Sequence, residues 1–242
     1  MSIFMEVQGL GKSFGALKAV DDLSFTVEKG EILGIAGPNG SGKSTLFNLI
    51  TKIPFSADRG HIVLEGENID KVSETALTRR GVIRTFQREA LFGSLSCVDN
   101  ILVAIEQTHG IRGSHAERRA DEASDIVGFP KNFHNMPAAS LPIFYQKQLM
   151  ITTAVAQDPI LLLLDEPASS LIHEEIDWVR QAILKLQARG ITILLIEHVL
   201  PLLTSVSSRL LVMEQGRKIA LGNASDVIEE PAVIDAFLGQ AQ

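Results

Sequence analysis

The sequence ILGIAGPNGSGKSTLFNLI at residues 32–50 places a glycine-rich loop between a short aliphatic run and a helical pattern. Residues 37–45 satisfy the pattern G-x-x-x-x-G-K-[ST]. The glycines allow backbone N–H groups to turn inward onto phosphate oxygens, and the start of the next helix adds the positive end of its dipole. The stretch therefore predicts a strand, a phosphate-binding loop and a helix in succession.

Two side chains of this loop have specific expected roles. Lys43 supplies a positive charge for the β- and γ-phosphates, and the Ser44 hydroxyl is available to Mg²⁺. A glycine-rich turn of chance composition is disfavoured, because both the loop and its flanks fit the pattern. We expect ATP to be contacted by Gly37, Asn39, Gly40, Ser41, Gly42, Lys43, Ser44 and Thr45.

A second polar element follows the aliphatic run Ile160–Leu164. An unbroken aliphatic run is typical of a buried parallel strand, and open α/β sheets place ligands at the carboxyl ends of such strands. Asp165 is therefore expected to hold Mg²⁺, directly or through water. Glu166 is expected to orient and deprotonate the attacking water as a general base. Alone, the pair would also fit a solvated acidic turn.

The aliphatic run Ile191–Ile196 likewise ends in polar residues, Glu197 and His198. We expect His198 to contact the γ-phosphate and the attacking water. The alternative for a lone histidine is an ordinary residue at the start of a helix.

Gln87 and Phe14 are weaker candidates. Gln87 follows the predicted strand Val82–Phe86, and its amide could reach Mg²⁺ or water; a lone glutamine often has no such role. Phe14 could stack on adenine, or it could be an ordinary loop aromatic.

Composition excludes several classes of protein. The 242 residues are 45% hydrophobic, which excludes a disordered chain, and the single cysteine, Cys97, excludes a disulfide framework. A net charge of −7 without a basic block argues against nucleic acid as a partner. No apolar stretch approaches the roughly 20 residues of a spanning helix, and the N-terminus lacks a secretory pattern. The mean hydropathy of +0.19 fits either a docking face or a well-filled core.

The pattern of segments predicts a β-rich N-terminal third, a helical middle and a βαβ C-terminal half. Ser96 with Asp99 three residues later predicts a capped helix start, and Gly190 predicts a helix stop. A closing hairpin is expected over Leu210–Glu214 and Lys218–Leu221.

Taken in order, GPNGSGKST at 37–45, FQ at 86–87, LLLLDEP at 161–167 and EH at 197–198 resemble the ATP-binding subunit of an ABC transporter. The resemblance runs from Val7 to about Leu238. RTFQ at 84–87, IEHV at 196–199 and VIDAFLG at 233–239 are similar to the ATPases of branched-chain amino acid importers, the LivG type.

This resemblance implies an α/β P-loop NTPase with a RecA-like core, an antiparallel β subdomain and an inserted helical subdomain. Residues 1–242 would form one ABC ATPase domain, with the core and β subdomain in 1–87 and 159–242 and the helical subdomain in 88–158. It further implies that Phe14 is the adenine platform, Gln87 the Q-loop residue and His198 the switch histidine. Two such subunits sandwich two ATP molecules head to tail.

The function implied is that of an ATP-hydrolysing subunit that powers an importer for branched-chain or other amino acids. It would bind ATP and Mg²⁺, a second ATPase subunit and membrane permease subunits, and lie on the cytoplasmic face of the cell membrane. The alternative is a poorly hydrolysing regulatory subunit of a heterodimeric complex. A soluble ABC ATPase of DNA repair or translation is disfavoured, because coiled-coil insertions and tandem ATPase domains are absent from the sequence.

One segment departs from the family. Its signature, L-S-G-G-Q or L-S-Y-G-Q, aligns with Leu141–Tyr145, which reads Leu-Pro-Ile-Phe-Tyr. Pro142 lacks the serine hydroxyl and Phe144 replaces a glycine, although proline at a helix start should still permit the helix. Ser170 and Ile172 are also unusual for the loop after Glu166. Either this chain forms a heterodimer with a partner whose signature is intact, or it is a divergent paralogue with little activity.

Overall fold

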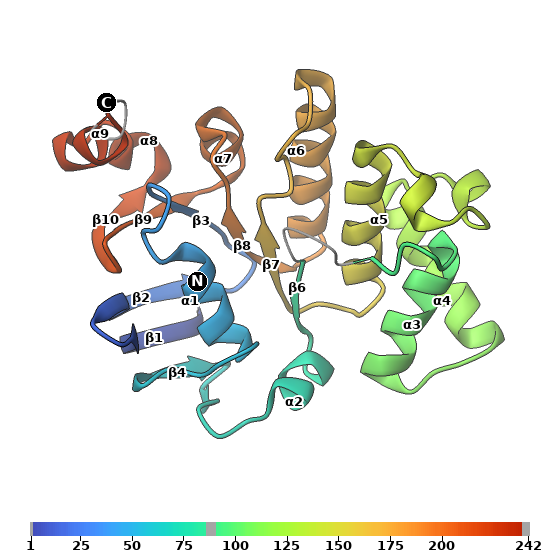
Figure 1. Cartoon of the computed structure of the whole chain (residues 1–242), viewed down its shortest axis with the longest axis horizontal. Coiled ribbons are helices and arrows are strands. Elements are labelled where there is room, and N and C mark those ends of the chain that lie inside the picture. Colours follow the sequence, from blue (N-terminus) through green and yellow to red (C-terminus); the bar gives the residue numbers. More distant parts are fainter. Residues whose placement is uncertain (1, 86–90, 239–242) are drawn as a thin grey trace.

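The structure, a computed structural model, describes residues 2–85 and 91–238. Among these residues the strands form two sheets (Figure 1). The four-stranded antiparallel sheet has the order β2 (Leu17–Glu28), β1 (Ile3–Phe14), β4 (Arg59–Leu64), β5 (Glu67–Asn68). The six-stranded sheet has the order β10 (Arg217–Asn223), β9 (Arg209–Glu214), β3 (Ile32–Ala36), β8 (Thr192–Ile196), β7 (Leu161–Asp165), β6 (Val82–Arg84).

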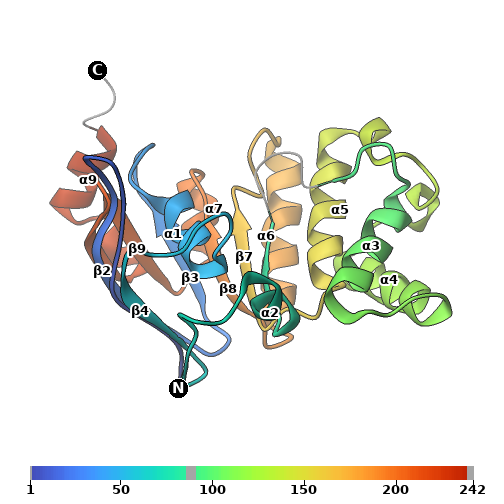
Figure 2. The ribbon, with the colours of Figure 1, turned by 60° about the horizontal axis from the view of Figure 1, so that its bottom comes forward.

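The helices cover the larger sheet and extend beyond it (Figure 1). Helix α1 lies between the two sheets, whereas α3, α4 and α5 pack on one another beyond β6 and β7, far from β1 and β2 (Figure 2). The helices are α1 (Lys43–Thr51), α2 (Glu74–Arg79), α3 (Cys97–His109), α4 (Ser114–Val127), α5 (Ile143–Val155), α6 (His173–Gln187), α7 (Leu200–Val206), α8 (Ala224–Val227) and α9 (Pro231–Leu238).

Both faces of the central parallel strands are buried, which explains their aliphatic sequences. In β7, Leu161 and Leu163 pack with α1 and the smaller sheet, while Leu162 and Leu164 pack on the opposite face with residues of α3 to α7. Strands β3, β7 and β8 run parallel, so their carboxyl ends meet at one edge of the sheet. That edge carries the phosphate loop and both predicted pairs of polar residues.

The predicted ends of several elements are confirmed. The Ser96 hydroxyl oxygen accepts the Asp99 N–H at 3.1 Å at the start of α3, and α6 ends three residues before Gly190. The closing hairpin forms between β9 and β10. Strand β6 ends at Arg84, whereas the sequence predicted a strand to residue 86, which lies outside the described residues. Strands β1 and β2 each span 12 residues, and register shifts interrupt their pairing.

Two further features concern exposure to solvent and membrane. Within the described ranges, every helix is too short or too polar to cross a membrane. Cys97 is buried at the start of α3, where its thiol donates to the carbonyl oxygen of Met136 at 3.2 Å. Burial raises the pKa of this thiol, which lowers its reactivity.

Candidate nucleotide site

The phosphate loop follows β3 and needs glycine at two positions because neighbouring backbone approaches closely. A Cβ atom at Gly37, where φ is 139°, would lie 2.0 Å from the carbonyl oxygen of Met213 in β9. One at Gly42, where φ is 103°, would lie 2.2 Å from the carbonyl oxygen of Ala19 in β2. Larger residues would therefore displace the loop from its contacts with both sheets.

Lys43 lies inside the loop at the first position of α1. Its ammonium donates to the carbonyl oxygens of Gly37 at 2.7 Å and Pro38 at 2.9 Å. Burial lowers the pKa of Lys43, and the negative charges of Glu166 and Asp165 act in the opposite direction. The ammonium therefore lies close enough to both carboxylates for their charges to act on it.

The other residues of the loop differ in exposure. Ser41 is buried, whereas Asn39, Gly40 and Ser44 are exposed and Thr45 is partly exposed. The hydroxyl of Ser44 is thus accessible beside the buried ammonium of Lys43.

Asp165 is buried at the end of β7. One of its oxygens accepts from Arg84 at 2.8 Å, and the guanidinium of Arg84 also donates to Asn48 at 2.5 Å. The other oxygen, Oδ1, is buried with no hydrogen-bond partner among the described residues. A carboxylate oxygen in this condition is a suitable ligand for a hard cation such as Mg²⁺. The sequence analysis did not identify Arg84 as a site residue. Its position as a charged residue at the end of a buried strand could have indicated this role.

Glu166 and His198 form a pair across the carboxyl ends of β7 and β8. His198 Nε2 lies 2.9 Å from Glu166 Oε1, and the N–H of Glu166 donates to the carbonyl oxygen of Ile196 at 2.9 Å. The side chain of Glu166 is 14% exposed and that of His198 is 42% exposed. The pair can therefore meet a ligand or water at this edge while remaining fixed to the sheet.

Two buried charged residues, Lys147 and Glu197, lie beside this pair and were not assigned a role from the sequence. Lys147 of α5 donates to the carbonyl oxygen of Glu166 at 3.2 Å and to the hydroxyl of Ser169 at 2.9 Å. Glu197 accepts the N–H of Ala168 at 2.6 Å. Burial lowers the pKa of Lys147 and raises that of Glu197. Their positions in the sequence gave no sign that they are buried.

The two weaker candidates have different outcomes. Phe14 ends β1 with 46% of its surface exposed, its ring edge-on to that of Phe55 at a centroid distance of 5.0 Å. The ammonium of Lys12 lies 5.6 Å from the Phe14 centroid. Phe14 is thus partly open to solvent, and its role stays a prediction. Gln87 lies outside the described residues.

The degenerate segment Leu141–Tyr145 leads into α5, which begins at Ile143 directly after Pro142. The helix therefore forms in spite of the proline, as expected from the sequence. The ring of Phe144 packs edge-on against Trp178 of α6, with centroids 5.5 Å apart. Ile143 remains 49% exposed. The substituted residues thus form an apolar and aromatic helix start in place of a polar one.

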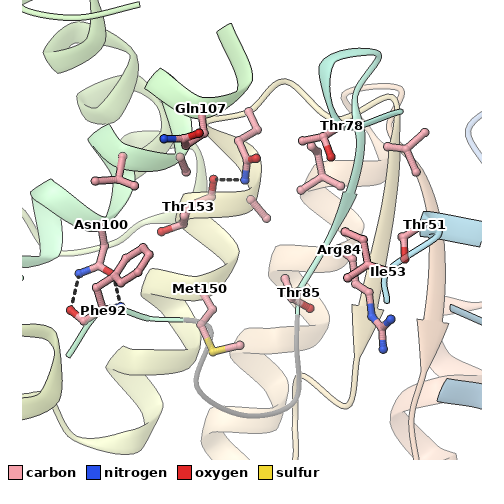
Figure 3. Close-up of a pocket in the computed structure, with 16 residues that line it drawn as sticks. Thr51, Ile53, Thr78, Arg84, Thr85, Phe92, Asn100, Gln107, Met150 and Thr153 are labelled. Carbon is pink, nitrogen blue, oxygen red and sulfur yellow. Dashed lines mark hydrogen bonds between the residues drawn. The ribbon is translucent and has the colours of Figure 1, made fainter. Parts of the chain in front are cut away.

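A groove of about 280 Å³ lies between β6, α3 and α5. Figure 3 shows Asn100 and Gln107 on the α3 side, Thr153 and Met150 on α5, and Arg84 on the side of β6. The groove has no lining residue from the phosphate loop, and its lining includes Thr85 and Phe92.

Comparison with known proteins now decides the family. A family model described as "ABC transporter" matches residues 20–169. This chain belongs to the ABC transporter family. The branched-chain amino acid transport ATP-binding protein BraF of Pseudomonas aeruginosa is 35% identical, with 98% of each chain covered. The corresponding LivG of Escherichia coli is 33% identical, also with 98% of each chain covered.

Solved structures support the same assignment of this ABC ATPase. The ADP conformation of the ATP-binding cassette MJ1267 superposes with a TM-score of 0.90 at 27% identity, covering 99% of this chain and all of that one. A nucleotide-free cassette superposes with a TM-score of 0.89 over the same shares of the two chains. The expected P-loop NTPase fold, the ABC family and the ATPase class are therefore confirmed.

Proposed function

We propose that this chain binds MgATP and hydrolyses it to power an importer for branched-chain or other amino acids. The observation that carries the proposal is the convergence of Lys43, Asp165, Glu166 and His198 at one edge of the sheet. The substrate class rests on the similarity to transport proteins named for branched-chain amino acids.

In this proposal each site residue has a role in binding ATP or in its hydrolysis. The loop backbone and Lys43 bind the phosphates, and Phe14 stacks on adenine. Glu166 takes the proton of the attacking water, while His198, 2.9 Å away, orients that carboxylate and reaches toward the γ-phosphate. Gln87 would join the site from the segment between β6 and α3.

Mg²⁺ fits the residues present. Asp165 Oδ1 is buried and without a hydrogen-bond partner in the described part of the chain, and Ser44 offers an exposed hydroxyl. These two side chains would hold the ion, with Gln87 as a further ligand. When bound, Mg²⁺ neutralises charge on the β- and γ-phosphates. The ion pair with Arg84 fixes the orientation of the Asp165 carboxylate.

The residues that would bind this chain's own ATP differ in preservation from the segment that would face the ATP of a second subunit. This difference supports a heterodimer. The residues for this chain's own ATP are intact, whereas Pro142 and Phe144 replace the groups that serve the ATP of the other subunit. A partner with an intact signature would complete the site built on this chain. A homodimer would present the degenerate segment to both ATP molecules.

The groove beside β6 is the proposed docking place for a permease subunit. Its wall includes the hydroxyl of Thr153, which is buried and without a partner among the described residues. The division into a core with residues 1–87 and 159–242 and a helical unit of residues 88–158 would let that unit transmit movement. The chain would then lie on the cytoplasmic face of the cell membrane.

The transport function is tested by uptake of radiolabelled leucine, isoleucine and valine in cells that lack the gene. We expect uptake to fall and to be restored by the wild-type chain but not by Glu166→Gln. A radiolabelled sugar serves as the control substrate. Unchanged uptake of all amino acids in the deleted strain would refute the importer assignment.

A second function is favoured by the degenerate segment alone: a regulatory subunit that binds ATP and hydrolyses it poorly in every complex. The two functions separate in the cell-based assay. A regulatory subunit predicts that Glu166→Gln restores uptake as well as the wild-type chain does.

A further inference from the structure

We propose that Lys147 and Glu197 form a buried brace that holds residues 166–170 in position for hydrolysis and ties this turn to α5. The inference rests on the proposed role of Glu166 as general base. Neither residue is assigned contact with ATP or with water. Both are positioning residues, which act through the turn that follows β7.

The turn needs external support because of its backbone conformation. Glu166 and Ser170 both have positive φ, 51° and 65°, a region that residues with a Cβ atom rarely adopt. Such residues persist only where their surroundings hold them. The turn has internal hydrogen bonds, such as the Ser169 N–H to the Glu166 carbonyl oxygen at 3.2 Å, but it also requires contacts from outside.

Lys147 supplies these contacts from the side of α5. Its ammonium donates to the carbonyl oxygen of Glu166, which also accepts the Ser169 N–H, and to the hydroxyl of Ser169. Lys147 is only 6% exposed. A lysine this buried is costly unless its charge is compensated and its donors are used. The compensating charges come from Glu197, Glu166 and Asp165.

Glu197 supplies the contacts from the side of β8. One carboxylate oxygen accepts the Ala168 N–H at 2.6 Å, and the other accepts the His198 N–H at 3.1 Å. Glu197 is 3% exposed. Its two oxygens therefore connect the middle of the turn to the backbone that carries the histidine partner of Glu166.

The arrangement has a mechanical consequence. Helix α5 also begins within the degenerate segment, so residues 143–145 and Lys147 belong to the same helix. Movement of α5 away from β7 must stretch both hydrogen bonds of Lys147. The position of Glu166 is therefore sensitive to the position of α5.

The test uses the full-length chain with Lys147→Met, Lys147→Arg, Glu197→Gln and the matched control Lys185→Met. Lys185 is an exposed lysine on α6, so its replacement removes the same charge without touching the turn. Amide hydrogen exchange of residues 166–171 is followed without nucleotide. Equilibrium ATP binding and single-turnover ATP hydrolysis are measured with protein in excess. Fluorescence of Trp178, the one tryptophan of the sequence, reports the packing of α5 on α6.

Lys147→Met is expected to speed exchange of the Ala168 and Ser169 amides at least tenfold and to slow single-turnover hydrolysis at least tenfold. ATP affinity should stay within about twofold of wild type, since the phosphate loop is untouched. Lys147→Arg should recover part of both losses because it retains the donors. Glu197→Gln should speed exchange at Ala168, and Lys185→Met should change nothing.

Unchanged exchange and hydrolysis in Lys147→Met would overturn the brace. The brace would also be overturned if ATP affinity fell as much as the hydrolysis rate and the Trp178 emission shifted. That result would indicate general disruption of the helix. A wild-type chain that fails to bind ATP would instead refute the proposed function. The exchange measurements would still judge the brace in that case, because they require no nucleotide.

Discussion

The carboxyl edge of the central sheet and the N-terminal end of α5 both stand where polar groups are expected, yet only the first has them. At the sheet edge, Lys43, Asp165 and Glu166 present charged groups within reach of one another. At the start of α5, Ile143 is half exposed and Phe144 packs on Trp178. One region is built for a charged ligand and the other for apolar contact.

This difference separates binding from turnover. In the proposed function, ATP is bound by groups within one chain, whereas fast hydrolysis needs donors from a second subunit. A chain can therefore keep its nucleotide while losing the ability to complete its neighbour's site. The contrast predicts that the rate of ATP hydrolysis depends more on the residues that a second subunit presents to the site than on the residues of the site itself.

The largest expected effect comes from rebuilding the polar helix start. The quadruple change Pro142→Ser, Ile143→Tyr, Phe144→Gly and Tyr145→Gln restores both a hydroxyl donor and a close-approaching backbone. Each such preorganised donor is worth roughly 10²–10³-fold in rate. We expect the wild-type chain alone to hydrolyse ATP very slowly, and the rebuilt chain to do so at least a hundredfold faster in a steady-state phosphate-release assay.

The control for this experiment is Phe144→Leu alone, which removes the ring without adding a donor and should stay slow. Dimer formation with ATP is checked by light scattering. Fast turnover by the wild-type chain without a partner would show that the substitutions at residues 142–145 do not matter as argued.

Glu166→Gln in the rebuilt chain should reverse that gain, because the amide keeps the shape of the carboxylate and loses the base. General-base catalysis contributes about 10²–10⁴-fold. Phosphate release should fall by this factor while ATP remains bound. Turnover equal to that of the rebuilt parent would mean that another group takes the proton.

Lys43→Ala should weaken ATP binding by about a hundredfold or more. The ammonium can exchange its bonds to Gly37 and Pro38 for charge-assisted bonds to phosphate, and bonds to charged groups are worth roughly 1.5–3 kcal/mol each. Equilibrium dialysis with labelled ATP measures the change, with Lys185→Met as the matched loss of charge. Affinity within a few-fold of wild type would contradict the assignment of the loop.

The smallest expected effect is a change in stability, and it concerns a second place where an apolar residue stands at the start of a helix, the N-cap of α6. Ile172 occupies the N-cap of α6, 64% exposed and without a side-chain acceptor for the helix N–H groups. Ile172→Asp supplies that acceptor and should stabilise the fold by about 1 kcal/mol in urea unfolding. Ile172→Ala removes the same apolar surface without adding an acceptor, so equal stability of the two variants would argue against a missing cap.

Sequence patterns predicted the loop and strands at the carboxyl edge of the central sheet well, because glycine spacing and aliphatic runs act locally. The loop at 37–45, the strands that end at Asp165 and Ile196, and the Ser96 cap all depend on neighbouring residues in the chain. Lys147 was not predicted as buried, since a lysine in a helical pattern usually faces water. Its environment comes from a turn 19 residues away, which no local pattern encodes.

The packing of Phe144 was unpredictable for a similar reason. Its partner, Trp178, belongs to a different helix, and the choice between a ring on the surface and a ring against α6 depends on how two helices meet. The register shifts in β1 likewise follow from pairing with β2 and β4, not from the order of residues in β1 alone.

The burial of Cys97 makes the natural chain ready for site-directed labelling. Its thiol is the one thiol in the sequence, is buried at the start of α3, and has a raised pKa. Maleimide dyes react with accessible thiolates, so a cysteine introduced at Ile143 would carry the label without prior removal of the native one. A fluorophore there would report, by quenching or energy transfer, when another protein surface closes over the start of α5.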